Sequence, residues 1–119
     1  MFNMFPYVDK YGLHCSCGKT ALEVYFLEAG MRGSLQIRCI NHEMPGNVVC
    51  CVNDVPKIIE KHCLIFNPND LSNHTVDKER YTDLCKIVRK QLIESICPRI
   101  KEDEKYYKYI VQKINNIIL

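Results

Sequence analysis

The 119-residue chain lacks the motifs that mark the common catalytic and phosphate-binding sites. It contains no His-Glu-x-x-His, which a zinc protease needs, and no His-x-Glu with Pro-Cys-x-x-Cys, which zinc deaminases share. No Cys-x-x-Cys is present, which argues against a thioredoxin-like redox role. A nucleophile pairing Cys50 or Cys51 with His42 stays open, but nothing in the sequence favours it. We therefore expect a protein that is not an enzyme.

Long apolar runs are also missing. No 18 consecutive residues are apolar, and the first residues do not place a basic segment before an apolar one. We therefore expect no membrane association and no secretory signal, and a cytoplasmic location. In that reducing compartment the eight cysteines would stay reduced, and clustered cysteines would favour a metal over disulfides.

A large excess of one charge is missing as well. The net charge is +2, well below the basic excess of most nucleic-acid-binding domains. Residues 55–119 carry the larger share of Lys and Arg, so any basic surface is expected in that half. Tryptophan is absent while Ile, Lys and Asn are abundant, a composition typical of AT-rich genomes such as those of many phages and mobile elements.

Alternating apolar and polar residues predict a small β part. The alternation covers 21–26 and 34–39, and the two-glycine segment 28–33 between them is interpreted as the turn of a hairpin. Pro45-Gly46-Asn47 predicts another turn, and the apolar run 48–52 suits a third strand. We therefore expect a small three-stranded antiparallel sheet.

Helical periodicity replaces alternation in the second half of the chain. Asp54 is expected to cap a short helix over 55–62, and residues 67–70, Asn-Pro-Asn-Asp, break the chain. Apolar residues at spacings of three and four then predict a helix from Asp77 to Pro98 and a last helix over 102–118. These two helices are expected to form an antiparallel pair that covers the sheet.

The length suits one domain with its own core. We expect a single α+β domain over 1–119, with a zinc-binding β part at 13–53 and a helical part at 54–119. A zinc-stapled hairpin within the three-stranded sheet would be followed by the short helix and the C-terminal helical pair.

Cysteine and histidine occur in two close pairs at the ends of the predicted hairpin, Cys15-Ser-Cys17-Gly18 and Cys39-Ile-Asn-His42. Three thiolates and one imidazole are the ligands that tetrahedral zinc takes in structural sites. The glycine after Cys17 lets the backbone curl and aim N–H groups at the sulfurs. We predict a structural Zn²⁺ site formed by Cys15, Cys17, Cys39 and His42.

One residue separates Cys15 from Cys17, a spacing less common at a shared metal. Other side chains can therefore replace one of the four ligands: His14, Cys50, Cys51 or Cys63. The competing interpretation is that the cysteines pack as small apolar residues. We favour packing for Cys85, Cys97 and Cys63, and we expect His62 and His74 at the surface.

The two pairs resemble the zinc-ribbon group, in which a Cys-x-x-Cys-Gly knuckle and a second Cys-x-x-Cys/His knuckle flank a β-hairpin. The resemblance covers residues 13–43, and the first knuckle is one residue shorter here. It implies a zinc-stapled hairpin. Because zinc-ribbon relatives often serve in transcription or replication, it also implies nucleic-acid binding as an alternative function.

The helical part offers a candidate partner surface. Lys86, Arg89 and Lys90 lie away from the apolar stripe of their helix, and Tyr109 is expected to point outward. Acidic residues are interleaved with these cations, as on an ordinary solvated face. The stripe that ends at Ile117-Ile118-Leu119 is wide enough to permit a homodimer through the last helix.

These observations favour a non-enzymatic, zinc-stabilised protein-interaction module. An accessory or inhibitory protein of a phage or mobile element, for example an anti-CRISPR or other anti-defence protein, fits the size and composition. We expect a protein partner, with nucleic acid as the alternative and a small metalloenzyme as a weaker third option.

Overall fold

The computed structural model describes residues 5–29, 32–42 and 48–119. Its helices and strands form a small α+β fold, as predicted. In chain order the elements are β1 (Tyr7–Asp9), β2 (Gly12–His14), β3 (Leu22–Ala29), β4 (Arg32–Cys39), β5 (Val48–Cys51), the 3₁₀ turn η1 (Val52–Asp54), α1 (Val55–His62), β6 (Leu64–Asn67), β7 (Asp70–Val76), α2 (Lys78–Glu94), α3 (Pro98–Lys101) and α4 (Glu104–Ile117).

The central sheet has the strand order β3-β4-β5, with both neighbouring pairs antiparallel. Leu22 lies opposite Cys39, so the open end of the β3–β4 hairpin carries Cys39. The predicted hairpin and third strand are confirmed. Both long strands run further than predicted, into most of segment 28–33, because they keep pairing as far as Ala29 and Arg32. The turn predicted at 45–47 lies outside the described residues.

The helix predicted over 55–62 is confirmed as α1, but its predicted cap is not. The Asp54 carboxylate accepts a hydrogen bond from the Cys51 N–H at 3.1 Å and makes no capping bond to α1. The reason is that residues 52–54 form a 3₁₀ turn, which carries Asp54 back toward the end of β5.

The predicted helix 77–98 is α2, capped by the Asp77 side chain, which accepts from the Arg80 N–H at 3.1 Å. It ends at Glu94, earlier than predicted, because the next residues pair with β3. The Val24 N–H donates to the Ser95 carbonyl at 2.9 Å, and the Cys97 N–H donates to the Val24 carbonyl at 2.8 Å. Pro98 therefore begins α3 and does not end α2.

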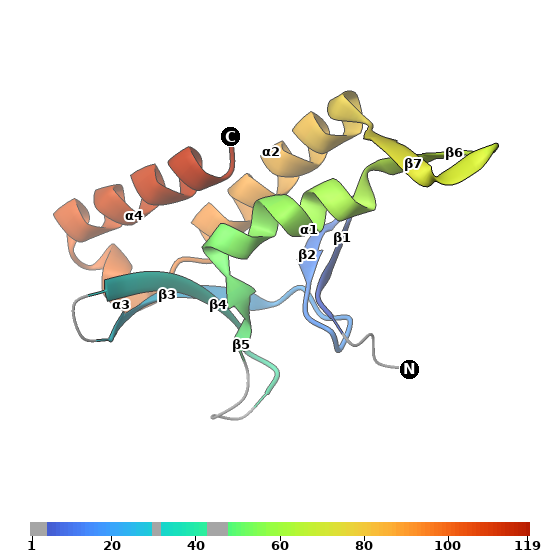
Figure 1. Ribbon diagram of the computed structural model, residues 1–119. Coiled ribbons are helices and arrows are strands. Elements are labelled where there is room, and N and C mark those ends of the chain that lie inside the picture. The colour runs from blue at the N-terminus through green and yellow to red at the C-terminus, as the bar shows by residue number, and fades with distance from the viewer. Residues whose placement is uncertain (1–4, 30–31, 43–47) are drawn as a thin grey trace.

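Two short hairpins were not predicted. β1 pairs with β2 near the N-terminus, and β6 pairs with β7 between α1 and α2. Residues 67–70, expected to break the chain, lie at the turn of the second hairpin. This hairpin, residues 64–76, is called the arm below. It extends away from the rest of the molecule (Figure 1).

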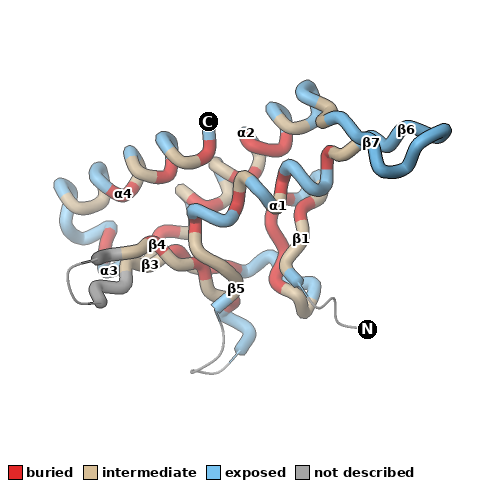
Figure 2. The backbone as a smooth tube through the Cα atoms, in the orientation of Figure 1, coloured by how far each residue is buried: buried red, intermediate tan, exposed pale blue. Residues whose placement is uncertain are grey.

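The core lies between the sheet and the helices. α4 runs back beside α2, and both helices lie over one face of β3 and β4 (Figure 1). Fully buried side chains come from the sheet, from α1 and from both long helices: Val24, Ile37, Ile59, Val88, Leu92, Ile110 and Ile114. The buried stretches face one another across this space, whereas the arm is exposed along almost its whole length (Figure 2).

The arm also explains the elongated shape. The radius of gyration is 15.4 Å, compared with about 13.5 Å for a compact domain of this length. Among the described residues, no helix has both the length and the apolar character needed to cross a membrane.

Candidate metal centre

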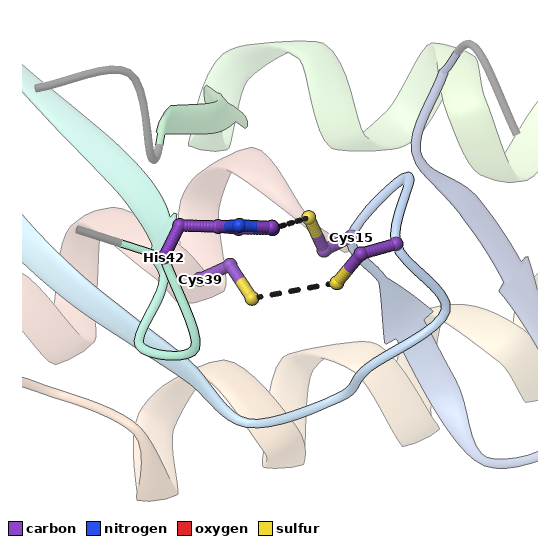
Figure 3. Close-up of side chains that lie close together, drawn as sticks. Cys15, Cys39 and His42 are labelled. Carbon is purple, nitrogen blue, oxygen red and sulfur yellow. Dashed lines mark hydrogen bonds between the residues drawn. The ribbon is translucent and has the colours of Figure 1, made fainter. Parts of the chain in front are cut away.

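The four ligands predicted from the sequence lie together. The ligand atoms of Cys15, Cys17, Cys39 and His42 are all within 4.8 Å of one another. Cys15 Sγ is 3.5 Å from His42 Nε2, and Cys17 Sγ is 3.8 Å from Cys39 Sγ. Figure 3 shows the side chains of Cys15, Cys39 and His42 turned toward a common point. This group can hold a metal ion.

Each pair of ligands comes from one tight turn. In the first turn, which follows β2, the Gly18 N–H donates to the Cys15 carbonyl at 2.8 Å, and the Cys15 N–H donates to the Lys19 carbonyl at 2.9 Å. Gly18 has a φ of +92°, a left-handed conformation that favours glycine. The second turn begins at the last residue of β4, where the His42 N–H donates to the Cys39 carbonyl at 3.4 Å.

Burial and hydrogen bonding divide the four ligands. Cys15 and Cys39 are buried, Cys17 is half-buried and His42 is exposed. A hydrogen bond from the Lys19 backbone N–H, ahead of weaker effects, lowers the pKa of the Cys17 thiol to about 7. Burial raises the pKa of Cys15. Because a metal takes the thiolate and not the thiol, the pKa values favour ligation by Cys17 over ligation by Cys15.

The distances distinguish metal binding from a disulfide. The three cysteines are not in disulfides, and the 3.8 Å between Cys17 Sγ and Cys39 Sγ far exceeds the S–S bond length of about 2.05 Å. The ligand atoms of these two turns, which lie far apart in the sequence, nevertheless converge to within 4.8 Å of one another. The donor set therefore fits a shared metal ion.

The alternative ligand His14 has a different role. Its Nδ1 lies 2.9 Å from the Gly18 carbonyl oxygen and its Nε2 lies 2.8 Å from Asp9 Oδ1. Both ring nitrogens are therefore engaged by oxygen atoms of the protein, and neither is free for a metal. The ring also stacks on Tyr7 at 4.5 Å. His14 thus ties the first ligand turn to the β1–β2 hairpin.

The pKa of Asp9 reflects this contact. Partial burial alone would raise it, but the hydrogen bonds from His14 and from the Tyr11 N–H lower it. The sequence did not reveal this pairing, because a histidine next to a cysteine is read first as a ligand, and no pattern points to Asp9.

The remaining cysteines lie outside the cluster. Cys63 and Cys85 are buried in the core, as predicted for packing. Burial raises the pKa of Cys50 to about 12, so this thiol stays protonated. Cys97 is half-buried before α3. His62 and His74 are exposed, also as predicted.

The residues predicted for partner contacts differ in their surroundings. Lys86 and Lys90 are exposed on α2, whereas Arg89 is half-buried and donates to the Ile118 carbonyl at 3.0 Å, at the end of α4. Tyr109 is 47% exposed. Comparison with protein-family models, with curated proteins and with solved structures finds no match to this chain.

Proposed function

We propose that this protein is a non-enzymatic protein-interaction module whose sheet is stapled by a structural Zn²⁺ ion. The Cys₃His cluster is the observation that carries the proposal. In a regular tetrahedron with Zn–S near 2.3 Å and Zn–N near 2.05 Å, the S–S edges are about 3.8 Å and the S–N edges about 3.6 Å. The Cys17–Cys39 and Cys15–His42 distances are 3.8 and 3.5 Å.

The donor set favours zinc among the divalent metals. Soft thiolates and imidazole suit Zn²⁺, whereas Mg²⁺ and Ca²⁺ take oxygen ligands. The two turns also resemble zinc-ribbon knuckles. With four protein ligands no coordination position is left for a substrate, which favours a structural role over catalysis. The reduced thiols that such a site needs are consistent with a cytoplasmic location.

The arm supports the interaction part of the proposal. Ile65, Phe66 and Leu71 are 53%, 51% and 73% exposed. Asp70 is the only charged residue in the arm, within a chain of which 25% is charged. Clustered, uncharged apolar side chains on a projecting hairpin are typical of protein contact sites. We propose that another protein covers them, either with an open strand edge or with an apolar groove.

The biological setting in this proposal is that of an accessory or inhibitory protein. The small size and the AT-rich type of composition support an origin in a phage or mobile element, and an anti-defence role is one form of it. Contacts through Lys86, Lys90 and Tyr109, and a homodimer through the last helix, stay predictions. Ile110, Ile114 and Ile118 of that helical stripe are fully buried within the chain itself, and Leu119 is 82% exposed.

Two measurements test the proposal. Elemental analysis of the purified chain is expected to give about one zinc per chain, and Co²⁺ in its place should show the intense visible bands of tetrahedral thiolate ligation. A folded chain without metal, or an octahedral cobalt spectrum, contradicts the metal part.

The interaction part is tested by comparing capture from the native host. The wild-type chain is expected to retain a protein that the variant Ile65→Ser, Phe66→Ser, Leu71→Ser does not. Lys57→Ser, an exposed position on α1, serves as the control. If both variants retain the same proteins as the wild type, the arm is not the contact site.

A further inference from the structure

A pocket opens where the sheet meets the C-terminal helices. It has a volume of about 510 Å³, and its lining includes Glu23, Tyr25 and Phe26 from β3, Arg38 from β4, Arg99 from α3 and Tyr106 from α4. Such a volume lies within the range of about 300–1,000 Å³ that small-molecule sites occupy. Three aromatic rings and two guanidinium groups thus surround one pocket.

The aromatic rings continue beyond the pocket as a row along α4. Phe26 meets Tyr106 edge to face at 6.0 Å, and Tyr106 lies nearly parallel to Tyr109 at 6.5 Å. The Lys113 ammonium group lies 5.3 Å from the Tyr109 ring and 5.9 Å from the Phe26 ring. Tyr109, 47% exposed, presents its ring to solvent at the end of this row.

Three of the nearby acidic groups are engaged within the protein. Glu23 pairs with Arg38, whose guanidinium group lies 5.2 Å from the Tyr25 ring. Asp103 caps α4 by accepting from the Tyr106 N–H at 3.2 Å. Glu104 pairs with Lys108 at 3.2 Å.

The cations are less engaged. Arg99 is exposed and makes no hydrogen bond or ion pair with the residues that the structure describes. The Lys113 ammonium group lies over aromatic faces and makes no hydrogen bond or ion pair within the same described part of the chain. Arg99 and Lys113 can therefore both attract an anion beside the rings.

We propose that this pocket and the Tyr106–Tyr109 row bind single-stranded nucleic acid, with a base stacked on the rings and phosphates near Arg99 and Lys113. Stacking on aromatic side chains combined with cations along the backbone is how proteins hold single strands. A free nucleotide shares this chemistry, but the row extends past the pocket, which favours consecutive bases of a strand. This inference stands independently of the proposed protein contact through the arm.

Intrinsic fluorescence gives a direct readout of stacking. The chain has no tryptophan, so its emission comes from the seven tyrosines. The full-length zinc-loaded protein is titrated with an oligothymidylate of about 12 nucleotides at about 25 mM salt. Binding should quench tyrosine emission and raise the anisotropy of an end-labelled strand. With two cations near phosphates, affinity should fall about 25-fold for each tenfold rise in salt.

Matched variants locate the site. Tyr109→Ala is expected to weaken binding about tenfold, and Arg99→Ala should weaken it severalfold while reducing the salt dependence. Tyr11→Ala is the control, because Tyr11 is also exposed, at 69%, and also has a lysine near its ring, with Lys10 Nζ at 5.2 Å. No binding at low salt, or equal losses for Tyr109→Ala and Tyr11→Ala, would refute the proposal.

Two further ligands distinguish a nucleic-acid strand from a free nucleotide and from a simple polyanion. Thymidine monophosphate is expected to bind much more weakly than the oligonucleotide. Equal affinity for both would overturn the assignment to a strand in favour of a free nucleotide. Heparin carries charge without bases, so heparin that binds as tightly as the oligonucleotide would show simple attraction of polyanions and would also overturn the proposal.

Discussion

The β3–β4 hairpin and the arm have the same antiparallel pairing but differ in what holds them. The β3–β4 hairpin buries Leu22, Val24 and Ile37 on one face, and its open end meets the candidate metal centre at Cys39. In the arm every residue from 65 to 75 is exposed. An isolated two-stranded hairpin is only marginally stable in water.

One hairpin therefore contributes to the stability of the fold, and the other offers an exposed surface. The first hairpin draws its stability from the core and, in our proposal, from zinc. The arm is held to the body at its base, where the Asp77 N–H donates to the Cys63 carbonyl at 2.8 Å. Substitutions in the two hairpins should therefore have very different effects on folding.

The largest effect is expected for Cys39→Ser, which removes a thiol at the junction of the sheet and the proposed zinc site. Structural zinc contributes about 10–16 kcal/mol in zinc-finger peptides, as much as the whole stability of a typical domain. The variant should lose its zinc by elemental analysis and much of its strand signal by circular dichroism. Cys51→Ser, half-buried outside the cluster, should keep both. A metal-free Cys39→Ser protein with unchanged thermal unfolding would argue against a structural metal.

The next effect contrasts two leucines. Leu92 on α2 is fully buried, whereas Leu71 on the arm is 73% exposed. Leu92→Ala should lower the free energy of unfolding by about 2–5 kcal/mol through lost burial and the cavity left behind. Leu71→Ala should change it by less than about 0.5 kcal/mol. Urea denaturation of both variants measures the contrast, and similar losses would mean that the arm is packed in solution.

A smaller effect is expected at the joint between β2 and α2. Gln91 Nε2 donates to the Leu13 carbonyl at 2.9 Å, and Gln91 Oε1 accepts from the Leu13 N–H at 2.7 Å. Gln91→Met leaves the backbone N–H and carbonyl of the buried Leu13 without this partner, which should lower the free energy of unfolding by about 1–3 kcal/mol. Gln112→Met, at an exposed position of α4, is the matched control. Equal stability of the two variants would show that water replaces the Gln91 contacts.

The same joint explains why Gly12 suits its position. Its φ is +115°, and a Cβ there would come within 2.4 Å of Gln91 Oε1. The strained backbone and the close approach both disfavour any larger residue. Only the fold reveals this requirement, because Gly12 and Gln91 lie far apart in the sequence.

The elements that the sequence predicted are those with long, regular patterns. The β3–β4 hairpin, α1 and the two long helices follow from alternation and helical spacing, and the four ligands follow from their paired spacing. The end of α2 was misplaced because Ile96 continues the apolar spacing of the helix in the sequence. In the structure Ile96 lies beyond the helix and pairs with Val24 of β3. The sequence at one position cannot show whether an apolar residue continues a helix or pairs with a strand.

The arm was missed for a different physical reason. Its residues 65–75 are exposed on both faces, so no buried face imposes alternation, and Asn67-Pro68-Asn69-Asp70 resembles a simple chain break. The role of His14 was missed because its partners are a backbone carbonyl and Asp9, which leave no signature in spacing. Apolar periodicity in a sequence indicates which residues are buried. The arm and the role of His14 depend on polar contacts and exposed pairing, which leave no such periodicity.

The smallest effect on folding is expected when the arm itself is shortened. Leu64 and Val76 lie opposite each other in register, so an Asn-Gly turn can join them in place of Ile65–Thr75. Because the removed residues are exposed, zinc content should stay unchanged and the unfolding temperature should shift by only a few degrees, about the effect of 0.5 kcal/mol. The Cys63–Asp77 hydrogen bond at the base is retained in this design.

The shortened chain also tests the division between folding and contact. It should keep its core amide protection in hydrogen exchange while losing any partner that the wild-type chain captures through the arm. Retained capture would move the contact to the exposed face of α2 or α4, where Lys86, Lys90 and Tyr109 lie. Loss of zinc or of core protection would instead mean that the arm supports the fold, and would contradict the exposure of residues 65–75 in the structure.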